Sequence, residues 1–126
     1  MNKKMWLIIM SLLILTTSCF SEVSKPMSIK KAEQLLGKNK FDVKAFQTGD
    51  YKIRAKMAVD LITSKYYIGK PFADVKKDLG GHDGYFENDA IPAYILTDKT
   101  SKVVWQLVFI PDDKWEKVRS VEIRKN

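Results

Sequence analysis

Residues 93–124 read AYILTDKTSKVVWQLVFIPDDKWEKVRSVEIR, and their pattern is the strongest indication of the architecture. It contains three segments that are rich in β-branched and aromatic residues and are separated by polar turns. These segments are residues 93–97, 103–110 and 118–124. Because strands joined by short turns pair in antiparallel order, the sequence predicts a three-stranded antiparallel sheet.

The middle segment is apolar on both of its faces. Alternate side chains of a strand point to opposite faces of the sheet. One face carries Val103, Trp105, Leu107 and Phe109, and the other carries Val104, Gln106, Val108 and Ile110. In the third segment, one face carries Arg119, Val121 and Ile123, and the other carries Ser120, Glu122 and Arg124. The pattern of the middle segment predicts a central strand that is covered, at least in part, on both sides.

A pair of helices is predicted directly before the sheet. Asp50 is suited to cap the first helix, in which apolar residues recur at helical spacing to about residue 64. Pro71 fits the first position of the second helix, which runs to Leu79 and ends at Gly80. We expect an α+β domain of two layers, in which this antiparallel helix hairpin packs on the three-stranded antiparallel sheet.

The N-terminal segment has the pattern of a secretory signal peptide. Lys3 and Lys4 precede an apolar run, Trp6 to Leu15, that is too short to span a membrane. We predict a signal peptide at residues 1–18, a tether at 19–28 and a single α+β domain at 29–126. The domain is expected to begin with a short helix at residues 29–36, capped by Ser28 and ended by Gly37.

Cys19 is the only cysteine of the chain and directly follows the predicted cleavage site. The stretch LTTSC at residues 15–19 resembles the lipobox of bacterial lipoproteins, although Thr16 occupies a position that is more often aliphatic. The resemblance implies lipidation of Cys19, so that acyl chains, at about 0.8 kcal/mol per buried methylene, anchor the protein in the membrane. The alternative is an ordinary secreted protein that discards Cys19 or keeps it as a lone thiol.

The lipobox implies a location in the bacterial cell envelope. Phe20 and Ser21 follow Cys19, and no aspartate is present there, which by analogy with Gram-negative lipoproteins points to the outer membrane, facing the periplasm. The formal charge of the chain is +7, and removal of Lys3 and Lys4 with the signal peptide lowers it to +5. Because the basic residues are interspersed with acidic ones in an exported chain, we expect a mixed-charge surface near anionic head groups and no nucleic-acid partner.

Few residues suit catalysis or metal binding. His82 lies beside Asp83 in a glycine-rich loop, where it suits either a base, a metal ligand or a simple turn residue. Two carboxylate pairs suit either a cation site or turns, and these are Glu87 with Asp89 and Asp112 with Asp113. We favour the turn interpretation in each case, and we predict no catalytic residue, no metal site, no cofactor and no enzymatic activity.

Aromatic residues at the edges of the predicted elements are the candidates for partner binding. They are Tyr66 and Tyr67 at the turn between the helices, Tyr85 and Phe86 after the glycine loop, and Trp115 after the second strand. The alternative is that these side chains close the ends of a small core. If two of the groups converge in space, they form a surface for protein contact.

The stretch YIGKPFADVKKDLG at residues 67–80 resembles the turn and second helix of the BamE-like (SmpA/OmlA) small lipoproteins. In that family an aliphatic-Gly-x-[Ser/Thr/Pro] start is followed by Val and then by Leu-Gly. The order of helix, helix and three strands agrees with the family over residues 50–124, as does the lipobox. The stretch FQTGDYKIRAKMAVDL at residues 46–61 is also similar to a pattern in small bacterial lipoproteins of this fold.

The resemblance implies the fold and leaves the function open. BamE binds the outer-membrane β-barrel assembly machine, whereas relatives of the same fold include protein inhibitors of β-lactamase. We favour a non-enzymatic accessory or scaffold lipoprotein that contacts an unidentified envelope protein in outer-membrane assembly or integrity. The alternative is an inhibitor or immunity lipoprotein that blocks a periplasmic hydrolase or toxin. A lipid carrier would need a large internal apolar cavity.

Overall fold

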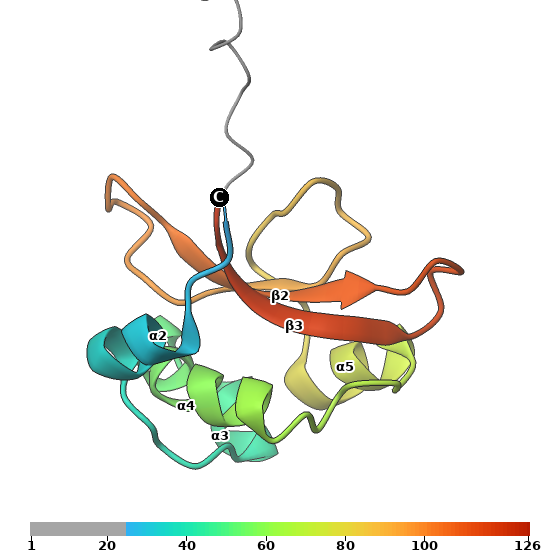
Figure 1. The fold of residues 1–126 in the computed structure, drawn as a ribbon, viewed down its shortest axis with the longest axis horizontal. Helices are drawn as coiled ribbons and strands as arrows, with labels where there is room; N and C mark the ends of the chain where they lie inside the picture. Colours follow the sequence, from blue (N-terminus) through green and yellow to red (C-terminus); the bar gives the residue numbers. More distant parts are fainter. Residues whose placement is uncertain (1–24) are drawn as a thin grey trace, which may run out of the picture.

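The computed structural model describes residues 25–126. Cys19, the predicted signal peptide and most of the predicted tether lie outside these residues. Within them the chain forms four helices followed by three strands, and the helices lie together on one side of the sheet (Figure 1). The elements are α2 (Ile29–Leu36), α3 (Val43–Thr48), α4 (Tyr51–Thr63), α5 (Phe72–Leu79), β1 (Ala93–Ile95), β2 (Trp105–Pro111) and β3 (Val118–Lys125). The predicted two-layer α+β domain is confirmed.

Polar side chains begin three of the four helices. Ser28 accepts a hydrogen bond from the N–H of Lys31 at 3.2 Å, and Asp50 accepts one from the N–H of Ile53 at 3.1 Å. These caps satisfy backbone donors that have no partner inside the helix, so the predicted starts of α2 and α4 are confirmed. Pro71 occupies the N-cap of α5, one position earlier than the sequence indicates.

Helix α3 is absent from the sequence prediction. It has six residues and one buried side chain, Phe46, which is too little for helical periodicity to be visible. Asp42 caps it by accepting a hydrogen bond from the N–H of Ala45 at 2.8 Å. Helix α3 packs against both α4 and α5, while α2 packs on α4. The predicted helix hairpin is therefore part of a larger helical layer.

The sheet has the order β1-β2-β3, and both pairings are antiparallel. Leu107 pairs with Tyr94 on one side and with Ile123 on the other, so β2 is the central strand, as predicted. Leu107 and Phe109 face the helices and belong to the main core. On the opposite face a smaller apolar cluster contains Ile91, Ala93 and Val108, with Phe86 and Ile110 packed against it. The prediction that β2 is covered on both faces is confirmed.

The free edge of β3 is met by two segments that are distant in sequence. The N–H of Gly69 donates to the carbonyl oxygen of Val118 at 2.8 Å, and the N–H of Val118 donates to that of Lys70 at 2.9 Å. At the other end of β3, the N–H of Met27 donates to the carbonyl oxygen of Ile123 at 2.8 Å. Met27 is also buried in the core, so the folded domain includes this residue of the predicted tether.

None of the helices within residues 25–126 combines the length and the apolar character that crossing a membrane requires. The longest of the described helices is α4, with 13 residues, and five of these residues are buried against the rest of the domain. The helices are thus core-forming elements of the helical layer.

Candidate binding groove

A groove of about 410 Å³ lies on the face of the sheet opposite the helices. Its floor comes from β2 and β3, and its walls come from the loop at residues 80–92 and from the turn at residues 111–117. The apolar residues that line it are Phe86, Ile91, Ile110, Pro111 and Trp115. The groove therefore joins segments that are about 30 residues apart in the chain, and its shape depends on how the loop and the turn are held.

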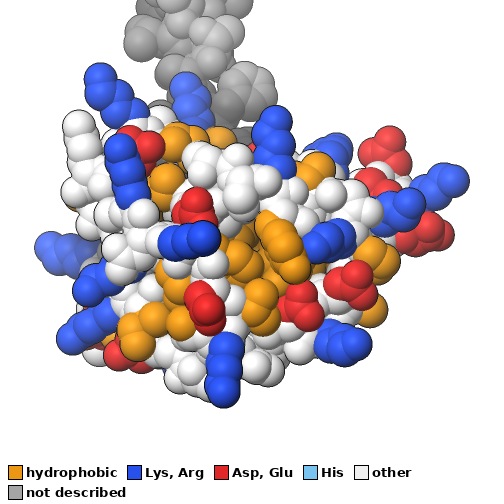
Figure 2. All heavy atoms as spheres, turned by 90° about the horizontal axis from the view of Figure 1, so that it is seen from below, with side chains coloured by type: hydrophobic (Ala, Val, Ile, Leu, Met, Phe, Trp, Pro, Cys, Tyr) orange, Lys and Arg blue, Asp and Glu red, His pale blue; other side chains and the backbone are white. Residues whose placement is uncertain are grey.

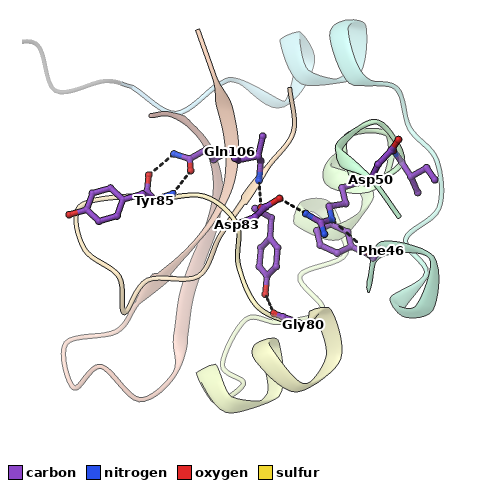
Figure 3. Close-up of polar contacts among 10 residues, drawn as sticks. Phe46, Asp50, Gly80, Asp83, Tyr85 and Gln106 are labelled. Atoms are coloured by element: carbon purple, nitrogen blue, oxygen red, sulfur yellow. Dashed lines mark hydrogen bonds and ion pairs between the residues drawn. The ribbon is translucent and has the colours of Figure 1, made fainter. Parts of the chain in front are cut away.

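The loop is held at Tyr85 by the buried side chain of Gln106. The Oε1 atom of Gln106 accepts a hydrogen bond from the N–H of Tyr85 at 2.7 Å, and its Nε2 atom donates to the carbonyl oxygen of Tyr85 at 2.7 Å (Figure 3). A Cβ atom at Gly84 would overlap Gln106 Oε1, so this approach requires glycine. The two bonds set the position of Phe86, the next residue, beside the groove.

A second anchor of the loop connects it to the helical layer through Asp83. One carboxylate oxygen of Asp83 accepts a hydrogen bond from the N–H of Ile95 at 2.9 Å, and the other pairs with Arg54 Nη1 at 2.9 Å (Figure 3). The Arg54 guanidinium also lies 5.6 Å from the ring centroid of Phe46 and 5.8 Å from that of Tyr94. The loop is therefore joined both to the edge of β1 and to helix α4.

Tyr94, in the core between the sheet and the helices, closes this network. Its hydroxyl donates to the carbonyl oxygen of Gly80 at 2.7 Å, at the start of the loop (Figure 3). Burial raises the pKa of Tyr94 to about 12. The positive charge of the nearby Arg54 lowers this pKa by a smaller amount. The hydroxyl stays protonated at neutral pH and keeps its role as a hydrogen-bond donor.

The turn at residues 111–117 is held by the carboxylate of Asp112. Its Oδ1 atom accepts hydrogen bonds from the N–H of Glu116 at 3.0 Å and from the N–H of Lys117 at 3.3 Å. Both bonds lower the pKa of Asp112, and the bond from the N–H of Glu116 has the larger effect. The interpretation of Asp112 as a turn residue is confirmed.

Trp115 projects from this turn with a backbone conformation that is rare for a large residue. Its φ angle is +59°, in the left-handed region, and its side chain is 51% exposed. Such a conformation costs on the order of 1–2 kcal/mol for a residue with a side chain. The turn thus presents an indole ring to solvent at an energetic cost.

Acidic side chains outnumber basic ones in the lining of the groove. The charged residues there are Glu87, Asp112, Asp113, Arg119, Glu122 and Arg124. On the floor, Arg124 Nε lies 2.8 Å from Glu122 Oε2, and the Arg124 guanidinium lies 5.6 Å from the ring centroid of Phe86. At the rim, Arg119 and Asp113 approach to 4.0 Å, with both side chains in solvent. Four carboxylates against two guanidinium groups leave a formal charge of −2.

The structure brings together two of the five predicted partner-binding residues, Phe86 and Trp115, in one groove. Tyr85 is exposed on the same loop, where its hydroxyl donates to the carbonyl oxygen of Glu87 at 2.8 Å. Tyr66 does not line this groove. It lies beside Tyr67, with 4.8 Å between ring centroids, and Lys70 Nζ lies 3.4 Å from its ring centroid.

The prediction that Tyr67 contacts a partner is wrong. Its ring is fully buried, with its centroid 5.7 Å from that of Phe109, and its hydroxyl donates to Asp78 at 3.1 Å. Burial also raises its pKa. Tyr66 and Tyr67 are adjacent in a turn without strand or helix periodicity, so the sequence does not show which ring turns inward.

The helical side of the domain has a different character. Seen from below, hydrophobic side chains gather in the middle of this face and charged groups surround them (Figure 2). Tyr66, Ile53 and Leu35 are among the large apolar side chains exposed in the domain, and all three belong to the helical half of the chain. None of these three residues lines the groove.

Several groove residues are missing from the sequence prediction. Ile110, Glu122 and Arg124 share the outer face of the sheet, and the alternation of strand residues already assigns them to one face. The alternation does not show that the loop and the turn rise on both sides of that face. Their pairing depends on contacts between distant parts of the chain.

The groove combines an apolar floor, an exposed indole ring and an acidic rim, which suits binding. Within residues 25–126, no three side chains of the metal-ligating types His, Cys, Asp and Glu gather closely enough to hold a metal ion. His82 belongs to the loop but does not line the groove. The arrangement offers both apolar and charged contacts to a ligand.

Comparison with known protein families, curated proteins and solved structures finds no match to this chain. The resemblance to the BamE-like lipoproteins stays a prediction from residues 67–80.

Proposed function

We propose that this protein is a non-enzymatic lipoprotein of the bacterial cell envelope that acts as an accessory or scaffold protein, through protein–protein contact at the groove. Cys19 carries the lipid anchor, and the protein serves outer-membrane assembly or integrity. The observation that carries the proposal is the convergence of Phe86 and Trp115, from two separately held segments, on one apolar floor.

The form of the groove supports a binding role. A volume of about 410 Å³ lies within the usual range of about 300–1,000 Å³ for binding pockets and matches a few side chains of a partner. Tryptophan is enriched among the residues that dominate the energy of protein interfaces. A half-exposed indole kept in a costly backbone conformation is best explained by a contact that it makes with another molecule.

Site-specific photo-crosslinking in cells tests the proposal. A photoreactive phenylalanine analogue replaces Asp113, whose side chain is fully exposed at the rim of the groove. The matched control carries the analogue at Leu35, which is exposed on α2 in the helical layer. We expect an envelope protein to be captured from position 113 and not from position 35.

The identity of the captured protein decides between function classes. Recovery of a component of outer-membrane assembly supports the accessory role, whereas recovery of one hydrolase or toxin replaces it with inhibition. Capture of nothing, or equal capture from both positions, contradicts contact at the groove. A Cys19→Ala protein that still fractionates with membranes would contradict the lipid anchor.

A further inference from the structure

The acidic groove is matched to a basic ligand, and we propose that it receives a segment of a partner protein that carries an arginine or lysine next to an apolar side chain. This inference rests on the proposed function and adds the chemistry of the partner. It follows from three features of the groove: its uncompensated carboxylates, the free face of Trp115 and the distribution of charge over the domain.

Two carboxylates of the lining have no basic partner within the groove. Arg124 is paired with Glu122 on the floor, and Arg119 is the nearest basic group to Asp113 at the rim. Glu87 and Asp112 remain, and the hydrogen bonds that Asp112 receives from backbone N–H groups favour its ionised form. A cationic side chain entering the groove would reduce the formal charge of the lining from −2 to −1.

The aromatic residues of the groove walls suit both the apolar methylene chain and the charged end group of an arginine or lysine. On one wall the groove already holds a guanidinium against a ring, since Arg124 lies 5.6 Å from the Phe86 centroid. In the described part of the chain no Lys or Arg lies over the Trp115 ring, which is half exposed. Indole is the strongest aromatic partner for a cation. Ile91 of the loop and Ile110 of the floor offer apolar contacts for a neighbouring side chain of the partner.

The charge distribution over the domain strengthens this preference. Residues 25–80, which form the helical layer, contain thirteen basic and six acidic side chains. Residues 81–126, which form the sheet and the groove, contain seven basic and eight acidic ones. A basic segment is therefore repelled by the helical side and attracted to the groove. An acidic peptide or an anionic lipid headgroup would meet like charge at the groove.

Binding of matched synthetic peptides to the full-length protein tests the inference. Three nine-residue peptides share two leucines and differ in two positions, which are both arginine, both serine or both glutamate. Calorimetry in mild detergent gives their dissociation constants at low and at moderate salt. We expect the arginine peptide to bind about tenfold more tightly than the serine peptide, the glutamate peptide to bind most weakly, and the preference to shrink with salt.

Two variants on the same loop distinguish binding in the groove from attraction to the overall charge of the protein. Glu87→Lys reverses a charge in the lining, and Asp89→Lys reverses one two residues away that does not line the groove. We expect Glu87→Lys to raise the dissociation constant of the arginine peptide about fivefold more than Asp89→Lys does. Equal effects of the two variants, equal binding of the three peptides or tighter binding of the glutamate peptide would overturn the inference.

The outcome also separates this inference from the proposed function. If position 113 captures an envelope protein while the peptides show no charge preference, the contact function stands and the basic-segment inference fails. If neither capture nor peptide binding occurs, both fail. If Trp115→Ala, which removes the ring, leaves the affinity of the arginine peptide unchanged, the groove is not its site.

Discussion

Gln106 and Tyr85 are joined by two hydrogen bonds of 2.7 Å, one in each direction, between the amide of the side chain and the backbone of the loop. Apart from the hydroxyl groups of Tyr67 and Tyr94, Gln106 carries the only polar group among the fully buried side chains of residues 25–126. A buried amide is tolerated when its donor and acceptor are both satisfied. This pair therefore holds the loop at 80–92 on the outer face of the central strand, where Phe86 forms one wall of the groove.

Replacing Gln106 by leucine removes both bonds and leaves the N–H and C=O of Tyr85 without partners. We expect a loss of about 2–4 kcal/mol in the free energy of unfolding, since each unsatisfied buried group costs about 1–3 kcal/mol. Urea denaturation measures the loss. The matched control is Gln34→Leu on the exposed side of α2, for which a change below about 0.5 kcal/mol is expected. Equal effects at the two positions would contradict the role of Gln106.

Gly84 and Gly81 provide a test of how closely the loop approaches the sheet. A Cβ atom at position 84 would overlap Gln106 Oε1 and lie 3.0 Å from the carbonyl oxygen of Ala93, whereas one at position 81 meets nothing within 4 Å. We expect Gly84→Ala to destabilise the protein by about 1–3 kcal/mol, as overpacking does, and Gly81→Ala to be close to neutral. Thermal or urea unfolding of both variants checks this. A neutral Gly84→Ala would mean that the loop shifts freely.

The ion pair of Arg54 with Asp83 connects helix α4 to the loop. The side chain of Arg54 is only 14% exposed, and that of Asp83 is 36% exposed. A double-mutant cycle with Arg54→Met and Asp83→Asn should give a coupling energy of about 1 kcal/mol or more, because the charges are partly removed from water. The pair of Lys38 with Glu33, in which the acid is as accessible as Asp83 but the lysine is 68% exposed, is the control, with an expected coupling below about 0.5 kcal/mol. If both cycles gave the same coupling energy, burial would not be the cause of the coupling between Arg54 and Asp83.

Because Tyr94 is buried, we expect the protein to lose stability at alkaline pH. Burial raises its pKa in the folded state to about 12, so the folded protein keeps this proton when the unfolded chain loses it. The contribution is fully present below about pH 10, the ordinary pKa of tyrosine, and is lost as the pH rises to about 12. We expect Tyr94 to contribute about 2–3 kcal/mol to the decline over that window, in addition to the contribution of Tyr67, and Tyr94→Phe removes only the part that belongs to Tyr94. Urea unfolding at a series of alkaline pH values measures it, and an equal decline in Tyr94→Phe would contradict the assignment.

Trp115 separates stability from binding. Asparagine tolerates a left-handed backbone better than tryptophan, so Trp115→Asn relieves part of the strain at φ +59° while losing the contacts of a half-exposed ring. We expect the free energy of unfolding to stay within about 1 kcal/mol of the original protein. Crosslinking from position 113 should be lost in the same variant. A large loss of stability would instead assign the ring to the fold.

Much of the framework follows from local patterns in the sequence. The starts of α2 and α4 follow from Ser28 and Asp50, because a cap bonds to a backbone N–H only three residues away. The faces of β2, and of β3 from Ser120 onward, follow from alternation along each strand. The prediction that Arg119 shares a face with Val121 and Ile123 is wrong, because the register shift at Ile110/Pro111 breaks the alternation and Arg119 lines the groove with Glu122 and Arg124. Helix α3 escapes prediction because six residues with one buried side chain show no periodicity.

The groove has a different origin, in contacts between residues that are distant along the chain. Tyr85 and Gln106 are 21 residues apart in the sequence, and Arg54 and Asp83 are 29 residues apart, so no local sequence pattern indicates either pair. The same holds for the choice between Tyr66 and Tyr67, where packing against Phe109 turns one ring into the core. Helix caps and strand alternation act over a few residues and are readable in the sequence. The loop, the turn and the acidic groove between them exist only once burial and hydrogen bonding have joined distant segments, which is why their positions come from the folded chain.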